Sequence, residues 1–211
     1  MSNIDELINK LAQDTTTVKI APHPYTVSIG WIGIGVVYLA MLLFISNVRH
    51  DLSLKLTDPW FVAELMALAG IFISSTFSTA LLVYPDLYQK RRVALIPFLM
   101  FALFTVVILL AWQANNPATP LPRHSIECTA SITLASLLPV AWAIYLMRKF
   151  ASTHTRWAGG ISFILVFSIG AIWSRIHEQN DSILHVIQWH YLPMIGFGLI
   201  GMYLGRTALK W

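Results

Sequence analysis

Charged residues are scarce in this sequence: only 11% of its 211 residues are Asp, Glu, Lys or Arg. A soluble domain averages about 25% charged residues, and 56% of this chain is hydrophobic, so a soluble globular core is not expected. Cysteine is nearly absent, because Cys128 is the one cysteine in the chain. This excludes a disulfide within one chain and a multi-cysteine zinc or iron–sulfur site. The composition indicates an integral membrane protein without a second sizeable domain.

Several sequence motifs are also missing. Neither a GxGxxG fingerprint nor a P-loop occurs, so nothing indicates a nucleotide-binding enzyme. The first 25 residues contain Asp5, Glu6 and Asp14 and do not resemble a cleaved signal peptide, so the first apolar run is expected to remain as a span. The net charge of +4 is better explained by basic cytoplasmic loops than by nucleic-acid binding.

Six apolar runs are each long enough to cross about 30 Å of hydrocarbon as a helix. They cover residues 27–46, 60–83, 93–113, 126–147, 157–174 and 183–205. Asp58 followed by Pro59 is a typical helix start, with a capping residue and then proline at the first helical position. We therefore predict an all-α, polytopic membrane protein in which residues 26–211 form a six-transmembrane-helix bundle.

The basic residues are distributed unevenly between the loops. With the amino terminus in the cytoplasm, ten of the 14 basic residues lie in cytoplasmic segments. These are Lys10, Lys19, Lys90, Arg91, Arg92, Arg148, Lys149, Arg156, Arg206 and Lys210. The outer loops then contain Arg49, Lys55, Arg123 and Arg175. The positive-inside rule favours this orientation, with both termini in the cytoplasm.

Residues 1–25 form a polar segment with one apolar stripe. The stripe follows helical i, i+3, i+4, i+7 spacing and consists of Ile4, Leu7, Ile8 and Leu11. A helix of this length is marginal in water by itself. It is expected to fold against its own membrane domain, the lipid surface or a partner protein.

The polar stretch between the fifth and sixth runs, WSRIHEQNDSILHVIQW, holds much of the chain's reactive chemistry. Lipid would leave such groups unsatisfied, so the stretch must lie in water or in a lined cavity. His177, Asp181 and His185 are spaced four apart, as are His124 and Cys128 with Glu127 between them. Thiolate and imidazole suit zinc or copper, whereas the alternative is a solvated loop with an interface histidine. His185 and His190 lie five apart on one helix, which is a poor arrangement for a haem.

Two further features of the spans have an ordinary and a functional interpretation. Glu64 lies about one turn into the second span. The functional interpretation is a proton or ion site. The ordinary interpretation is a carboxylate that bonds to a neighbouring helix or reaches the membrane interface. Gly201 and Gly205 form a small-xxx-small pair, for which close packing inside the bundle is favoured over dimerisation.

Several distinctive pieces are spread over the whole chain. In order they are DELINKLA, VKIAPHP, DPWFVAEL, YPDLYQKRR, SIECTASITLASLLP, NDSILHVIQWH and LGRTALKW. Together they resemble the NrsF family of six-span inner-membrane anti-sigma factors. No single piece is diagnostic, but their order, their spacing and the total length together make the match specific.

The resemblance implies a regulator of the bacterial inner membrane without enzymatic activity. It would sequester an extracytoplasmic-function sigma factor and release it on a periplasmic signal, with heavy metals and oxidative stress as suspected stimuli. The partners would be that sigma factor and membrane lipid, without direct binding of nucleic acid. Whether the protein forms a homodimer is left open. The expected sigma-binding residues are Ile4, Leu7, Ile8, Leu11 and, at the rim, Lys19.

The resemblance also implies two outward-facing cysteines, of which Cys128 matches the first. The second falls at about Glu178, so this chain lacks it. Three alternatives follow for this chain. It has lost the ability to sense, it senses through a Cys–His–carboxylate metal site, or it senses through a disulfide between two chains. The candidate sensing residues are Cys128, His124, Glu127, His177, Glu178, Asp181 and His185. No resident cofactor is expected; a transient soft or borderline divalent metal at the periplasmic face would use Cys128, His124, His177 and His185.

The main alternative is a small six-helix membrane transporter or channel, and a membrane enzyme or haem protein is a third reading. A sequestering protein needs a cytoplasmic binding surface, which the amphipathic segment 1–25 would supply, whereas a transporter does not need one. The amino-terminal segment therefore favours the anti-sigma factor.

Overall fold

The computed structural model describes residues 2–13, 21–85, 90–114, 126–150 and 152–209, which form helices and connecting turns without any strand. Six of the described helical segments are long and apolar enough to cross a membrane. They are Pro24–Ser46, Pro59–Leu82, Arg92–Ala114, Ile126–Met147, Thr155–His177 and Ile183–Ala208. The predicted all-α architecture with six spans is confirmed.

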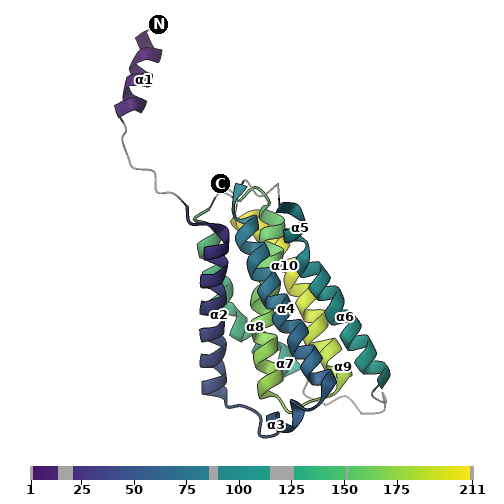
Figure 1. The fold of residues 1–211 in the computed structure, drawn as a ribbon. Coiled ribbons are helices and arrows are strands. Elements are labelled where there is room, and N and C mark those ends of the chain that lie inside the picture. Colours follow the sequence, from purple (N-terminus) through teal and green to yellow (C-terminus); the bar gives the residue numbers. More distant parts are fainter. Residues whose placement is uncertain (1, 14–20, 86–89, 115–125, 151, 210–211) are drawn as a thin grey trace.

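The helices are labelled as in Figure 1. The first, second, fourth and fifth spans are the single helices α2 (Pro24–Ser46), α4 (Pro59–Leu82), α7 (Ile126–Met147) and α8 (Thr155–His177). The third span is α5 (Arg91–Ala94) followed by α6 (Ile96–Ala114), and the sixth is α9 (Ile183–Val186), the π-helix η2 (Ile187–Tyr191) and α10 (Leu192–Ala208). Outside the spans lie α1 (Ser2–Gln13) and α3 (Leu52–Lys55).

Local sequence signals explain where the first two spans begin. The Asp58 side chain accepts a hydrogen bond from the Trp60 backbone N–H at 2.9 Å, and Pro59 occupies the first turn of α4. His23 plays the same part for α2, where its Nδ1 accepts from the Tyr25 N–H at 3.3 Å and Pro24 follows. The predicted start at Asp58 and Pro59 is confirmed.

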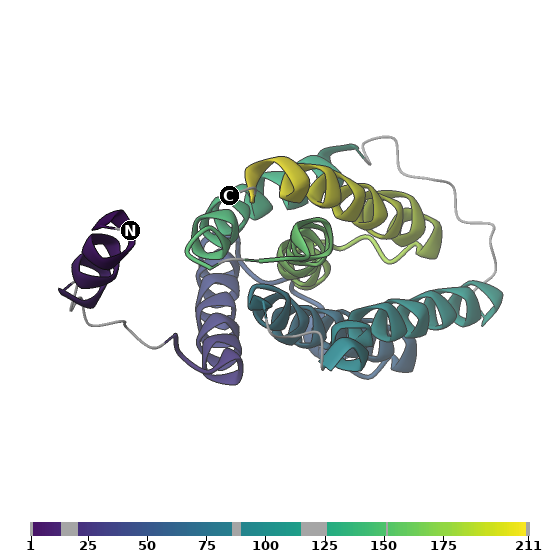
Figure 2. The ribbon, with the colours of Figure 1, turned by 90° about the horizontal axis from the view of Figure 1, so that it is seen from above.

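Helix α8 lies in the centre of the bundle, as Figure 2 shows from above. It contacts α10, α4, α7 and α2, and it is the most buried of the spans. Its sequence is rich in glycine and serine, which let the neighbouring helices approach closely. In contrast, α2 exposes large apolar side chains such as Val37 and Phe44, as expected of a helix that faces lipid.

Helices α8 and α10 approach each other closely at their glycines. A Cβ atom added at Gly159 would collide with the backbone oxygen of Gly201, and one added at Gly205 would collide with the backbone oxygen of Thr155. Gly201 and Gly205 of α10 therefore serve packing inside the bundle, which is the interpretation favoured from the sequence.

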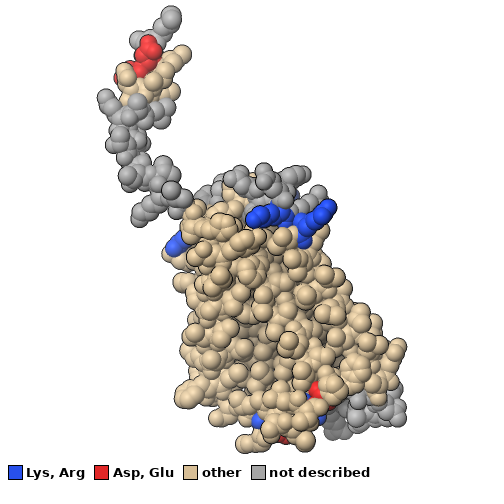
Figure 3. Space-filling model, in the orientation of Figure 1, with Lys and Arg blue, Asp and Glu red and all other residues tan. Residues whose placement is uncertain are grey.

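The two ends of the bundle differ in charge. The amino terminus of α2 and the carboxyl end of α10 lie at one end, and α3 lies at the other (Figure 1). Figure 3 shows Lys and Arg side chains gathered at the end that carries the termini, while a smaller group of both signs lies at the α3 end. The predicted orientation rests on this charge asymmetry, and it would put the α3 end at the outer face of the membrane.

Candidate functional site

Four ligand-type side chains meet at the α3 end of the bundle: Cys128, Glu178, His185 and His190. Their ligand atoms all lie within 4.8 Å of one another. The Cys128 thiol donates to Glu178 Oε2 at 3.0 Å, and its Sγ lies 3.1 Å from His190 Nε2. His185 Nε2 lies 3.2 Å from Glu178 Oε1. We call these four residues the outer cluster.

The ends of two spans bring the outer cluster together. Cys128 lies in the first turn of α7. Helix α8 ends at His177, and Glu178 follows as the cap with extended backbone, its N–H donating to the Ser174 carbonyl at 2.7 Å. The carboxylate thereby reaches Cys128, fifty positions earlier in the chain.

The π-helical turn η2 aligns the two histidines of the sixth span. In an α-helix, residues five apart differ by about 140° in direction, because each residue turns by about 100°. A π-turn pairs residues i and i+5 and largely removes this offset. The rings of His185 and His190 accordingly lie 5.4 Å apart in a T-shaped arrangement. His190 was not among the predicted metal ligands, and its position five residues after His185 on one helix was considered only for a haem.

Burial and charge distinguish the outer cluster from a solvated turn. The side chains of His185 and His190 are each 1% exposed, and Glu178 is partly buried. Burial raises the pKa of Glu178, but the contacts with His185, His190 and the Cys128 thiol outweigh it, so that the net pKa lies below its ordinary value. Glu178 is therefore a carboxylate at neutral pH, held among two imidazoles and a thiol.

Two other predicted sensing residues lie near the outer cluster without joining it. His177 Nδ1 is 2.8 Å from the Asn47 carbonyl oxygen, and its ring stacks on Trp173, so that the imidazole faces the loop after α2. Glu127 is exposed on α7. His124 lies outside the described residues, as do Lys19 and the side chain of Leu11.

Asp181 belongs to an ion-pair network beside the outer cluster. Its carboxylate lies 2.9 Å from Arg49 Nη1 and 2.7 Å from Lys55 Nζ. Burial raises the pKa of Asp181, but these two cations outweigh it and leave the pKa below its ordinary value. Arg49 also binds Asp51, at 2.7 Å. The network ties the loop around α3 to the segment after α8.

A buried ion pair continues this network into the bundle. Arg175 Nη2 donates to Glu64 Oε2 at 3.0 Å, and Nε lies 2.8 Å from Oε1. Both side chains are almost fully buried. Arg175 Nη1 also donates to the Asn180 carbonyl at 2.8 Å. Of the two interpretations of Glu64, the group bonded to a neighbouring helix is the one observed.

Comparisons with known proteins agree with the resemblance seen in the sequence. The family described as "NrsF: Negative regulator of sigma F" matches residues 11–211. A curated protein of Azospira oryzae, named "Probable anti-sigma-F factor NrsF", is 24% identical over 216 residues, covering 98% of this chain and 99% of the relative. No solved structure matches. The match extends over all six spans, the outer cluster and the basic carboxyl terminus, and the chain belongs to the NrsF family of negative regulators of sigma F.

Proposed function

We propose that this protein is an anti-sigma factor of the bacterial inner membrane that sequesters an extracytoplasmic-function sigma factor and releases it on a signal at the periplasmic face, metal or oxidative stress. The observation that carries the proposal is the amphipathic helix α1. Its apolar side chains Ile4, Leu7 and Ile8 are more than half exposed, although apolar side chains of a helix ordinarily pack against a partner.

The chemistry of α1 suits a protein groove better than a lipid surface. Its stripe is apolar, but its other face carries Asp5, Glu6 and a single lysine, Lys10. A helix that lies on an anionic membrane ordinarily has several basic residues on its polar face. An amphipathic helix that inserts its apolar face into a groove needs no such charge. The sigma factor is the partner that membership of the family supplies.

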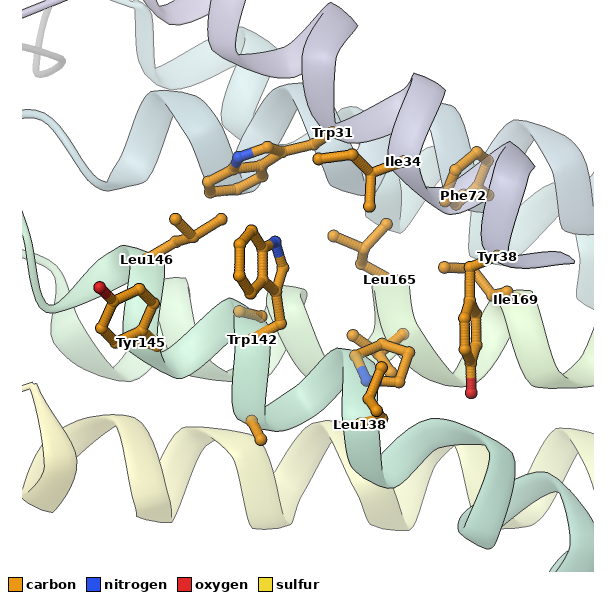
Figure 4. Close-up of a pocket in the computed structure, with 15 residues that line it drawn as sticks. Trp31, Ile34, Tyr38, Phe72, Leu138, Trp142, Tyr145, Leu146, Leu165 and Ile169 are labelled. Carbon is orange, nitrogen blue, oxygen red and sulfur yellow. The ribbon is translucent and has the colours of Figure 1, made fainter. Parts of the chain in front are cut away.

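A cavity between the helices weighs against the transporter alternative. A cavity of about 600 Å³ lies between α2, α7 and α8. Figure 4 shows Trp31, Tyr38 and Trp142 among the side chains that line it. None of the 15 residues that line it is charged. An ion or polar solute would lose its hydration there without replacement, so this cavity suits apolar chains such as those of lipid.

The sigma-binding proposal is tested with Leu7→Asp. A leucine buried in a groove contributes about 1.5–3 kcal/mol, and a carboxylate in its place is unfavourable. Affinity should fall more than about tenfold, and a reporter driven by the cognate sigma factor should rise toward its level in cells without the regulator. The matched control is Asn9→Asp, which adds the same charge on the opposite face of α1 and should leave repression intact.

Membrane abundance of each variant is measured by immunoblot, because a degraded regulator would also release the sigma factor. Full repression by Leu7→Asp at normal abundance, and by a chain lacking residues 2–13, would move the contact surface away from α1. The basic loop that includes Lys90 and Arg92 would then be the next surface to examine.

The orientation is tested by topology reporters. Fusions after residue 211 and within residues 84–92 are both expected to report the cytoplasm, and a fusion within residues 50–57 the periplasm. The physical reason is the concentration of basic side chains at the end with the termini. A periplasmic signal from either of the first two fusions would invert the orientation and remove α1 from the compartment of the sigma factor.

A further inference from the structure

The donor atoms of the outer cluster have the spacing of a metal site. A tetrahedral zinc ion with bonds of about 2.0–2.3 Å holds its ligand atoms about 3.3–3.8 Å apart. Here Cys128 Sγ lies 3.0 Å from Glu178 Oε2 and 3.1 Å from His190 Nε2, and the Nε2 atom of His190 lies 3.7 Å from Glu178 Oε2. Small shifts of these side chains would create a tetrahedral site.

The charges and donor types also match one ion class. A thiolate and a carboxylate contribute two negative charges, and two neutral imidazoles contribute none, so a divalent cation would leave the partly buried group neutral. A mixed set of sulfur, nitrogen and oxygen ligands suits a borderline ion such as zinc, whereas magnesium and calcium prefer oxygen ligands.

An independent observation is the unsatisfied state of the buried imidazoles. His185 is 1% exposed, and neither of its ring nitrogens has a hydrogen-bond partner among the described residues. Its Nε2 nevertheless faces the Glu178 carboxylate at 3.2 Å. Buried polar groups are normally satisfied, and a cation shared with the Glu178 carboxylate would satisfy this nitrogen.

Neighbouring groups hold the candidate ligands in place. Ser174 Oγ lies 3.2 Å from Cys128 Sγ and donates to Glu178 Oε2 at 3.3 Å. Thr129 donates to the Trp189 carbonyl at 2.7 Å and so ties α7 to the turn that carries His190. Such contacts orient the ligands of metal sites and raise the affinity for the ion.

We infer that the outer ends of the fourth, fifth and sixth spans form a binding site for one divalent zinc-class ion, with the ligands Cys128, Glu178, His185 and His190. On binding, the thiol proton passes to solvent and the thiolate sulfur coordinates the ion. The bound ion ties the three spans together at the outer face. The ion site is a separate inference from the proposed sequestering of a sigma factor. Ion binding is measured on the purified full chain without a sigma factor, so the ion site and the anti-sigma function can each fail alone.

The test is a metal titration of the full-length protein in detergent after chelation. Zn²⁺ is expected to bind at one equivalent per chain and to raise the unfolding temperature. Co²⁺ in the same site is expected to show a thiolate-to-cobalt absorption band, which reports the sulfur ligand directly. Glu178→Gln and His190→Gln should each weaken Zn²⁺ binding at least about tenfold, and Cys128→Ser should also abolish the cobalt band.

Matched controls are provided by Glu127→Gln and His177→Ala, which remove the same chemical groups from positions next to the outer cluster. Both should keep the wild-type affinity and the cobalt band. Absence of stoichiometric Zn²⁺ binding by the wild-type chain would overturn the inference, whether or not any variant folds. Cobalt binding without the thiolate band, or an equal loss of affinity in His177→Ala and His190→Gln, would overturn it as well.

Discussion

Replacing Arg175 with methionine is expected to destabilise the bundle by about 3–5 kcal/mol, because the carboxylate of Glu64 would stay buried without its partner. The substitution retains a long apolar side chain, so that the lost charge and hydrogen bonds dominate the effect. Arg175 also donates to the Asn180 carbonyl, and the loop after α8 would lose that anchor too. Unfolding of the purified protein by denaturant in detergent measures the change.

The control for the charge argument is the double variant Glu64→Leu with Arg175→Met. Replacing a whole buried ion pair with apolar residues is often close to neutral, so the double variant should recover much of the loss. Arg156→Met, at an exposed arginine, should change stability by less than about 0.5 kcal/mol. Equal stability of the single and double variants would show that Glu64 does not depend on Arg175.

The second large effect is expected from Gly159→Ala. The new Cβ would meet the backbone of Gly201 and Gly205, which cannot rotate away as a side chain can. The central helix α8 and α10 must then separate, and a cost of about 1–3 kcal/mol or more follows from the strain and the lost contacts. Thermal unfolding followed by circular dichroism measures the loss.

Gly196→Ala is the matched control, because a Cβ at Gly196 meets no atom within 4 Å. Alanine favours a helix over glycine by about 1 kcal/mol, so this variant should be neutral or slightly more stable. A stable Gly159→Ala protein would indicate that α8 and α10 do not approach as closely as the structure shows.

Much of the architecture follows from local sequence. A helix must cross about 30 Å of hydrocarbon with its backbone bonded internally, so that each apolar run near 20 residues predicts one span. The start of the second span follows from Asp58 and Pro59, since capping acts within a few residues. The amphipathic stripe of α1 is likewise a property of consecutive residues.

The composition of the outer cluster was only partly predictable. Cys128, Glu178 and His185 were among the candidate sensing residues, and the structure brings these three together with His190. His190 was missed as a ligand because no local pattern revealed the π-turn that aligns it with His185. His177 was included among the sensing candidates because its spacing from Asp181 and His185 fits a continuous helix. However, α8 ends at His177, and the His177 ring faces Asn47.

The sequence by itself determined the number of spans, the distribution of basic residues and the apolar stripe, because hydrophobicity and charge act through short segments and the surrounding solvent. Only the tertiary structure decided that Arg175 neutralises Glu64, 111 positions away, and that Cys128 meets Glu178 across two helix ends. Such pairings depend on how the helices pack and where each one ends. Helix packing is determined by the sum of many weak contacts over the whole bundle. No local pattern of residues specifies that sum.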